Sequence, residues 1–219
     1  MIGLELGRPD SAPLTVLALG AHSDDIEIGC GGTILTLLGG ARPVHVIWVV
    51  LSARGERGRE AERSAAAFLD GADAREVVLE QFRDGFLPYD GAAAKDVFER
   101  LKGQVSPDLI LTHARHDLHQ DHRLVCELTW NTWRDHLILE YEVPKYDGDL
   151  GAPNVFAPLA EETLERKIAL LHEHFPSQSS KHWFAPELFR ALPRLRGMEA
   201  AAPTGLAEAF YGRKLVLLP

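Results

Sequence analysis

Residues 14–33 read LTVLALGAHSDDIEIGCGGT, and this stretch decides the fold class. It begins with an apolar run from Leu14 to Leu19, which has the length and composition of a buried strand. A polar turn follows, and then a glycine-rich segment that enters a helix. In an open α/β sheet, the turns beyond the carboxyl ends of the strands line the ligand crevice. The sequence therefore predicts a first strand that ends at a functional edge.

The same alternation of apolar runs and helical patterns continues along the first two thirds of the chain. Further strands are predicted at 44–51, 76–80, 108–112 and 137–142. Helices are predicted between them, at 32–38, 59–69, 93–104 and 124–133. Such alternation is typical of βαβ units and of a parallel sheet covered on both faces. We therefore predict an α/β fold, Rossmann-like, with three layers and a mostly parallel central sheet.

The C-terminal third has a different pattern. It contains predicted helices at 161–174 and 186–195, a Pro/Ser-rich stretch at 176–180 and a final strand at 208–217. No low-complexity linker separates it from the rest. We expect this helical extension to close over the pocket and to add an edge strand. The chain is thus predicted to be one domain, 1–219, with a sheet region at 1–142 and the C-terminal helices and final strand at 143–219.

The overall composition limits the classes of partner. Of 219 residues, 46% are hydrophobic and 25% are charged, and the formal net charge is -9. These values argue against a largely disordered chain. They also argue against a nucleic-acid partner, because nucleic-acid-binding domains carry a basic face. We expect a small-molecule partner, and a homo-oligomer is left open.

The cysteines and the apolar segments suggest a compartment. Cys30 and Cys126 are the only cysteines and do not form a C-x-x-C pair, which favours a reducing cytoplasm. Residues 1–16 lack the basic and apolar regions of an export signal. The longest apolar run, Val46 to Leu51, is far shorter than the roughly 20 residues of a membrane helix. The expectation is a cytoplasmic protein without membrane insertion.

The polar turn after the first strand carries a cluster of acids and a histidine. His22 and Asp25 are three residues apart, so in a helical turn both can face one point, while Asp24 points elsewhere. One alternative is that Ser23, Asp24 and Asp25 cap a helix by accepting hydrogen bonds from free backbone N–H groups. A cap needs only one oxygen, however, and crowded carboxylates are stabilised by a cation. The cluster therefore indicates a metal site.

The glycines that follow raise a second alternative. Glycine-rich turns before helices cradle the pyrophosphate of dinucleotides. The spacing of Gly29, Gly31 and Gly32 is not G-x-G-x-x-G directly after the strand, and acids occupy the place of the phosphates. A nucleotide- or methyl-donor-binding Rossmann protein without hydrolase activity is therefore the second choice.

A second polar cluster follows the strand predicted at 108–112. Four of the chain's ten histidines fall within it, at His113, His116, His119 and His122. His119 and His122 are three residues apart, so one could bind a metal while the other reaches toward a substrate. For His113 and His116 taken singly, ordinary hydrogen bonding in a strand end or loop is the simpler explanation.

Asp121 lies between the last two histidines. It either caps a helix or accepts the second ring N–H of His119 or His122. Together the two clusters offer two imidazoles and a carboxylate for a metal, with a further carboxylate and imidazole for proton transfer. These are the groups that a metal-dependent hydrolase requires.

With both clusters considered, the chain resembles the LmbE-like, or PIG-L, family of zinc-dependent N-acetylglucosaminyl deacetylases. The first motif of that family, Ala-His-Pro-Asp-Asp-Glu, is similar to Ala21–Glu27. Its second motif, His-Pro-Asp-His at the start of a helix, is similar to His119–His122. The C-terminal third resembles the family only through the step Ser177-Gln178.

The resemblance implies a zinc site and a role for each residue. His22, Asp25 and His122 would bind Zn²⁺, Asp24 would be the general base, and His119 would be the general acid or oxyanion stabiliser. The implied reaction removes an N-acetyl or N-acyl group from an amino sugar or sugar conjugate. A ligand set of two histidines and one aspartate also suits Fe²⁺, so zinc itself comes from the family.

The chain departs from the family motifs at three positions. Ser23 and Gln120 replace prolines, and Ile26 stands where the first motif has glutamate, with Glu27 one place later. The lost prolines could loosen the turns without removing a ligand. The departures leave the role of Glu27 open.

The substrate contacts are less defined by the sequence. Arg54 follows the second predicted strand and is a candidate for binding sugar hydroxyls or a phosphate, with a solvated charged turn as the alternative. Trp130 and Trp133 on a predicted helix are expected in the core. The identity of the acylated substrate stays open.

Overall fold

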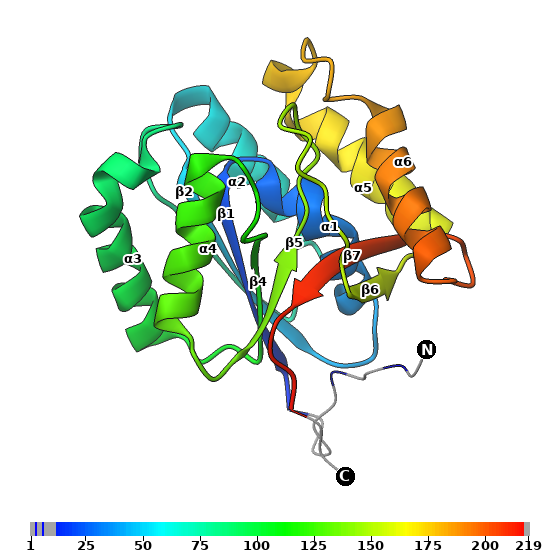
Figure 1. Cartoon of the computed structure of the whole chain (residues 1–219), viewed down its shortest axis with the longest axis horizontal. Helices are drawn as coiled ribbons and strands as arrows, with labels where there is room; N and C mark the ends of the chain where they lie inside the picture. Colours follow the sequence, from blue (N-terminus) through cyan, green and yellow to red (C-terminus); the bar gives the residue numbers. More distant parts are fainter. Residues whose placement is uncertain (1–2, 4–5, 7–11, 217–219) are drawn as a thin grey trace.

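The central feature of the computed structural model is a seven-stranded sheet (Figure 1). The structure describes residues 3, 6 and 12–216, and within them the strand order is β3-β2-β1-β4-β5-β7-β6. The first five strands are parallel, while β7 is antiparallel to both β5 and β6. The strands are β1 (Leu14–His22), β2 (Val44–Ser52), β3 (Ala74–Leu79), β4 (Leu109–His113), β5 (Leu137–Tyr141), β6 (Val155–Pro158) and β7 (Ala207–Gly212).

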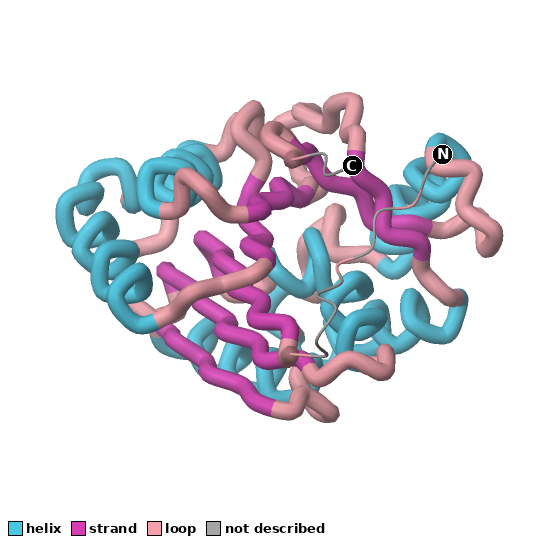
Figure 2. Tube along the Cα trace, turned by 90° about the horizontal axis from the view of Figure 1, so that it is seen from below, coloured by secondary structure: helices cyan, strands magenta, loops and turns pink. Residues whose placement is uncertain are grey.

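Helices cover both faces of this sheet (Figures 1 and 2). One core cluster joins the sheet to α1, α2 and α5, and a second joins its other face to α3 and α4, while α6 packs on β7. Two short 3₁₀ turns are η1 (Leu87–Asp90) and η2 (Pro176–Gln178). The helices are α1 (Asp25–Leu38), α2 (Gly55–Phe68), α3 (Gly91–Gln104), α4 (Gln120–Thr132), α5 (Glu161–His174) and α6 (Pro186–Glu199).

The continuous apolar runs of the central strands follow from this double cover. In β2, Val46 and Trp48 enter the first core cluster, whereas Ile47 and Val49 enter the second. Successive strand side chains point to opposite faces, so a strand buried on both faces must be apolar throughout. β1 pairs with β2 along its whole length and with β4 on its other side, which brings the ends of β1 and β4 together.

The glycines of the first cluster lie inside α1 and serve packing. A Cβ atom on Gly29 would lie 2.1 Å from the ring of Tyr141 on β5. Glycine therefore allows the helix to rest directly on the sheet. Because α1 begins at Asp25, before these glycines, they do not form the phosphate-binding turn of a dinucleotide site.

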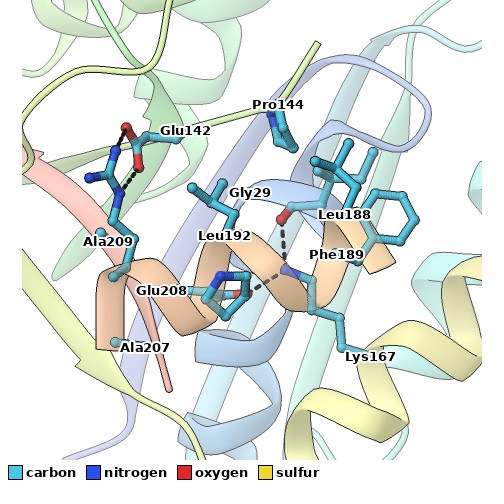
Figure 3. A pocket seen from close by; sticks show the side chains of 13 residues that line it. Gly29, Glu142, Pro144, Lys167, Leu188, Phe189, Leu192, Ala207, Glu208 and Ala209 are labelled. Atoms are coloured by element: carbon cyan, nitrogen blue, oxygen red, sulfur yellow. Dashed lines mark hydrogen bonds and ion pairs between the residues drawn. The ribbon is translucent and has the colours of Figure 1, made fainter. Parts of the chain in front are cut away.

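A buried ion pair fastens the C-terminal third to α1 (Figure 3). The Lys167 ammonium of α5 donates to the Ile28 carbonyl (2.6 Å) and to Glu208 of β7 (2.7 Å). Glu208 in turn accepts the backbone N–H groups of Gly32 (2.9 Å) and Thr33 (2.6 Å). A buried charge is tolerated when it is paired and hydrogen-bonded, and both charges are satisfied here.

The predicted fold class is confirmed, and several details were wrong. Helices α1, α2 and α4 begin at Asp25, Gly55 and Gln120, earlier than predicted, because their first turns carry the polar clusters rather than apolar residues. The final strand was expected to be an edge and to reach residue 217. It ends at Gly212 and lies inside the sheet, with the unpredicted β6 at the edge; residue 217 lies outside the described residues.

Two further expectations concern an export signal and membrane-spanning helices. The expectation that residues 1–16 carry no export signal concerns in part residues 1–2, 4–5 and 7–11, which lie outside the described part of the chain. Among the described helices, none combines the length and the apolar character that crossing a membrane demands.

Candidate metal centre and active site

Three side chains predicted to bind a metal meet at the carboxyl edge of the sheet. His22 is the last residue of β1, Asp25 is the first residue of α1, and His122 lies in the first turn of α4. His22 Nδ1 is 3.1 Å from His122 Nε2 and 3.2 Å from Asp25 Oδ2, and His122 Nε2 is 3.4 Å from Asp25 Oδ1. The two distant sequence clusters therefore form one site.

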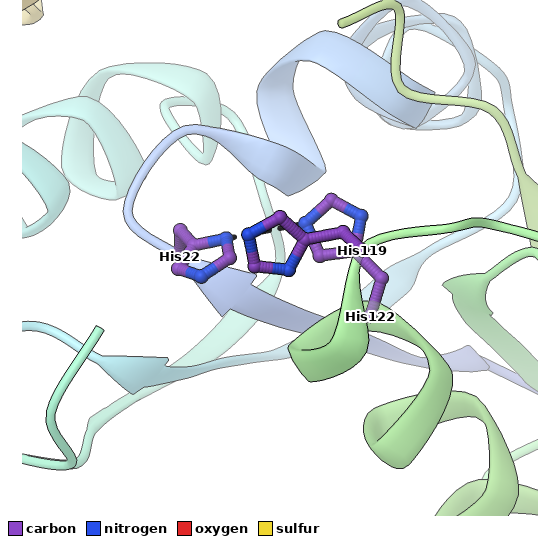
Figure 4. A group of neighbouring side chains, drawn as sticks. All are labelled: His22, His119 and His122. Carbon is purple, nitrogen blue, oxygen red and sulfur yellow. Dashed lines mark hydrogen bonds between the residues drawn. The ribbon is translucent and has the colours of Figure 1, made fainter. Parts of the chain in front are cut away.

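The spacing of these donor atoms is close to that of ligands on a tetrahedral ion, although Asp25 presents Oδ2 to His22 and Oδ1 to His122. With bonds of about 2.0–2.1 Å, two ligand atoms of tetrahedral Zn²⁺ lie about 3.3–3.4 Å apart. Three other combinations have donor atoms that all lie within 4.8 Å of one another, and Figure 4 shows the rings of the first. The combinations are His22, His119 and His122; Asp25, His113 and His122; and His22, Asp84 and Asp121.

Each of the two histidines predicted to bind the metal has a carboxylate at its other nitrogen. His22 Nε2 lies 3.2 Å from Asp121 Oδ2, and His122 Nδ1 lies 2.8 Å from Asp117 Oδ2. In neutral rings that donate to these carboxylates, the lone pairs of His22 Nδ1 and His122 Nε2 would face Asp25. The expectation that Asp121 would orient His119 or His122 through its carboxylate was wrong: it turns to His22, and Asp117 takes the place next to His122.

The electrostatics of the site favour positive charge. Burial lowers the pKa of His22 and of His122, but Asp25 and the orienting carboxylates outweigh burial and raise both pKa values above the ordinary range. Burial would raise the pKa of Asp25, yet the neighbouring histidines lower it well below its usual value. An ionised Asp25 carboxylate beside two imidazoles is a donor set that suits a divalent cation.

Asp24 is beside the donors and is not a helix cap. Its side chain makes no capping hydrogen bond at the start of α1. Arg57 Nη2 contacts Asp24 Oδ1 at 2.7 Å, and Oδ2 is buried without a hydrogen-bond partner among the described residues. Burial raises the pKa of Asp24 and Arg57 opposes the shift, with a net increase. One oxygen is therefore fixed and the other is free to accept a proton.

His119 is the N-cap of α4. Its Nδ1 accepts the backbone N–H of Asp121 at 3.2 Å, so the proton of the neutral ring is assigned to Nε2. Burial and the neighbours His122 and His22 lower the pKa of His119. Because Nε2 then carries hydrogen, His119 is suited to donate a hydrogen bond rather than to ligate a metal.

The remaining histidines of the second cluster have different environments. His113 is fully buried, stacks on His122 with ring centroids 3.8 Å apart, and accepts the Ala21 N–H at 3.0 Å. Burial and His122 lower its pKa to about 4, so the ring is neutral. His116 is exposed and meets Tyr211 edge-on. His113 thus supports a donor ring, and His116 lies apart from the site.

A pocket of about 400 Å³ opens over these groups. Its floor carries the donors with Asp24 and His119, and its outer wall comes from two loops after β5 and after η2. On the third side, the loop with Asp84 is held by Asp121, which accepts the N–H groups of Gly85 (2.8 Å) and Leu87 (3.2 Å). The wall residues are Val143, Pro144, Lys145, Tyr146, Asp147, Gln178, Lys181 and Trp183.

The arginine at this pocket is not the one expected. Arg54 is exposed and donates to the Gln81 carbonyl, so its guanidinium is bound outside the pocket lining. Arg57, one turn further along α2, lines the pocket instead. Sequence reasoning also missed Asp117 and Asp84. Asp117 could have been found from its position within the histidine cluster, whereas no sequence feature pointed to Asp84.

Glu27 lies behind the site and not in it. Its carboxyl is fully buried, and Oε1 accepts the hydroxyl of Ser64 on α2 at 2.5 Å. Burial raises its pKa to about 8, with the Ser64 hydrogen bond opposing the shift. Glu27 therefore joins α1 to α2 within the core.

Comparison with known proteins adds a family and several structures of the same fold. The family model described as PIG-L, GlcNAc-PI de-N-acetylase, matches residues 17–133, more than half of the 219-residue chain. An uncharacterized deacetylase of Escherichia coli (strain K12), YaiS, is 29% identical over 178 residues, covering 73% of this chain and 89% of its own.

Two solved structures illustrate the range of that fold. One is the N,N'-diacetylchitobiose deacetylase of Pyrococcus horikoshii, with TM-score 0.70, 20% identity, and coverage of 95% of this chain and 87% of its own. Another is GalB, a 4-carboxy-2-hydroxymuconate hydratase of Pseudomonas putida KT2440, with TM-score 0.70, 17% identity, and coverage of 94% and 98%. At these identities the likeness concerns the fold alone.

Proposed function

The chain belongs to the PIG-L family, and from this premise we propose that it is a metal-dependent hydrolase that removes an N-acetyl or other N-acyl group from an amino sugar or sugar conjugate. The observation that carries the proposal is the convergence of His22, Asp25 and His122 beside the free Oδ2 of Asp24. A hydrolytic site needs a Lewis acid and a base at adjacent positions, and these groups would supply both.

Under this proposal His22, Asp25 and His122 hold Zn²⁺. When bound, the ion supplies a Lewis acid that polarises the acyl carbonyl and brings the pKa of a water to about 7. Asp117 and Asp121 fix the two imidazoles in the tautomers that ligation needs. The donor set also suits Fe²⁺, so metal analysis of the purified protein decides the native ion.

Asp24 is the general base in this mechanism. Its Oδ2 takes a proton from the attacking water while Arg57 holds Oδ1. The amide C–N bond then breaks, and the same oxygen returns the proton to the departing amine. Burial raises the pKa of Asp24, and a carboxyl with a raised pKa is better suited to both transfers.

His119 is the stabiliser of negative charge. The N-cap hydrogen bond leaves its Nε2–H as a donor toward the pocket floor. A preorganised donor of this kind stabilises the oxyanion that develops on the acyl oxygen. The resemblance to the family allowed a general acid or an oxyanion stabiliser, and the lowered pKa of His119 favours the second role.

The pocket supports a small glycoside as substrate. Its volume of about 400 Å³ falls within the roughly 300–1,000 Å³ of small-molecule sites. Tyr146 and Trp183 offer ring faces for the apolar face of a sugar, and Gln178 and Lys181 offer donors for hydroxyls. This composition supports a sugar as the bound group.

The decisive test is acyl release by the purified protein from a panel of N-acylated sugars and their conjugates, with and without chelator. We expect release of acetate or another acyl acid that stops on chelation and returns when Zn²⁺ or Fe²⁺ is added. Because GalB shares the fold, the panel includes unsaturated hydroxy acids. Hydration of these with no amide cleavage would replace the proposal by a hydratase.

Three broader proposals accompany this function. The partner is a small molecule, since the formal net charge is -9, and residues 1–219 act as one domain. Cys30 and Cys126 are both buried and free, which supports a reducing compartment such as the cytoplasm. Sizing of the purified protein tests whether identical chains associate.

A further inference from the structure

The step Ser177-Gln178 lies in η2, far along the chain from the metal donors, and is bound to α2. The Ser177 hydroxyl donates to Glu60 Oε2 at 2.6 Å, and the Ser177 N–H donates to Glu60 Oε1 at 2.9 Å. Glu60 is fully buried. One side chain of α2 is thus held at both oxygens by a single residue of the C-terminal segment.

Glu60 in turn forms an ion pair with Arg57 on the same helix. Arg57 Nη1 contacts Glu60 Oε2 at 3.0 Å, and the guanidinium lies 5.3 Å from the centre of the Phe175 ring. Its other terminal nitrogen, Nη2, contacts Asp24 Oδ1 at 2.7 Å. The guanidinium therefore bridges a buried carboxylate that Ser177 fixes and the carboxylate beside the metal donors.

We propose that Ser177 and Glu60 are positioning residues for the reaction: they hold Arg57 against Asp24 Oδ1, so that Oδ2 alone is available to take the proton of water. The inference rests on the proposed role of Asp24 as general base. A planar guanidinium that bridges two carboxylates is preorganised, whereas a free arginine side chain samples many rotamers. The C-terminal segment thus acts on Asp24 through Arg57, which Ser177 contacts both by way of Glu60 and directly, with Arg57 Nη1 donating to Ser177 Oγ at 3.5 Å.

A double-mutant cycle tests this chain of contacts. The variants are Ser177→Ala, Ser177→Thr, Glu60→Gln, Arg57→Ala and Ser177→Ala combined with Arg57→Ala. The matched control is Ser179→Ala, because the Ser179 hydroxyl is exposed and donates to the Pro176 carbonyl within its own turn. For each protein we would measure kcat, KM and metal content on the best substrate of the panel.

The expected result has three parts. Ser177→Ala and Glu60→Gln each lower kcat about tenfold, as the loss of a hydrogen bond to a charged group implies, with unchanged metal content and little change in KM. Ser177→Thr, which keeps the hydroxyl, recovers most of the loss, and Ser179→Ala has no effect. In the Arg57→Ala background, Ser177→Ala causes no further loss, because its effect passes through Arg57.

Other outcomes would overturn the inference. Equal losses from Ser177→Ala with and without Arg57 would make Ser177 merely structural, and a change in KM alone would make it a substrate contact. Crystal structures of wild type and Glu60→Gln provide a readout without turnover: Arg57 should leave Asp24 in the variant. A wild type with bound metal that cleaves no panel amide defeats the proposed function, while these structures still decide whether Glu60 holds Arg57.

Discussion

The floor and the outer wall of the pocket are built in opposite ways. On the floor, Asp25 and His122 are buried and His22 is half-buried, and each histidine is held by a second residue, as Asp117 holds His122. The outer wall consists of loop residues, of which Tyr146 is 74% exposed. A rigid floor preserves the geometry of a reaction, and exposed loops are where substrate selection can change at little cost to the fold.

From this comparison we expect the reaction and the selection of substrate to be separable in this molecule. Variants on the floor should abolish or slow the reaction whatever the substrate, whereas variants on the wall should change affinity for particular substrates. The following variants test that separation from its strongest consequence to its weakest.

Removing a metal donor from the floor should have the largest effect. His122→Ala is expected to lose the metal and to lower activity by more than about a thousandfold, because the Lewis acid is lost with it. Elemental analysis and acyl release measure both. His116→Ala is the matched control, since His116 is exposed and contacts Tyr211 instead of the donors. A His122→Ala protein that retains stoichiometric metal would exclude His122 as a ligand.

Removing the base should slow the reaction without removing the metal. Asp24→Asn keeps the size of the side chain, and we expect kcat to fall by about a hundredfold or more, as is usual for lost acid–base catalysis. Metal content and the thermal midpoint, Tm, should stay near wild type. Parallel losses of metal and Tm would instead make Asp24 a structural residue of the metal centre.

Removing an orienting carboxylate should weaken the metal site. Asp117→Asn is expected to lower metal affinity about 10–100-fold, since Asp117 orients His122. Competition with a chromophoric chelator gives the dissociation constant. Asp149→Asn serves as control, because Asp149 shares Lys145 with Asp117 but does not contact His122. Equal effects of the two variants would trace the loss to Lys145 and not to the imidazole.

On the outer wall the effects should be smaller and should depend on the substrate. Tyr146→Ala and Trp183→Ala are expected to raise KM about three- to tenfold, as the loss of an aromatic contact implies, with kcat and metal content unchanged. The full panel measures whether the rank order of substrates changes. A loss in kcat common to all substrates would show that the wall takes part in the reaction and that the separation fails.

Glu27 lies just behind the floor and should affect stability alone. Burial raises its pKa from 4.5 to about 8, so between these pH values the folded state binds more protons than the unfolded state. The free energy of unfolding should therefore fall as pH rises through this window. Glu27→Gln removes this titration, so from pH 5 to pH 8 its Tm relative to wild type should rise by about 3 °C or more.

The matched control for that measurement is Glu62→Gln, because Glu62 is an exposed glutamate on α2. Its Tm difference from wild type should be the same at both pH values. A Glu27→Gln difference that is equally flat would mean that Glu27 is already ionised in the folded protein.

The strand ends and their polar clusters were predictable from the sequence, and most of the supporting contacts were not. Apolar runs such as that of β1 mark a doubly buried strand, so the residues directly after it fall at the ligand edge. The resemblance to the PIG-L family, now confirmed by the family match, added the assignment of roles. Arg57 was not predicted as a pocket residue. Whether Arg54 or Arg57 reaches the pocket depends on which face of α2 meets it, and the sequence alone does not show this.

The elements that were missed lack a local signal for a physical reason. β6 has only four residues, is not buried and ends in a proline, so its local strand signal is weak, and it forms because β7 provides a pairing partner. The early start of α1 was missed because glycines are poor helix formers. Gly29 is nevertheless part of the helix, and a glycine is required there because a Cβ atom would clash with the ring of Tyr141. This contact joins residues distant in the sequence, so the sequence pattern does not reveal it.

The family match ends at residue 133, yet the helix that begins with Asp25 is anchored from beyond that boundary by Lys167 and Glu208. Removing either Lys167 or Glu208 leaves the other charge unpaired in the protein interior, which lowers the free energy of unfolding by about 3–5 kcal/mol. A chimaera that grafts the tail of a relative onto residues 1–142 must therefore import both members of the pair or design out both. Exchanging the C-terminal segment to change substrate specificity is therefore limited by an ion pair that lies away from any substrate.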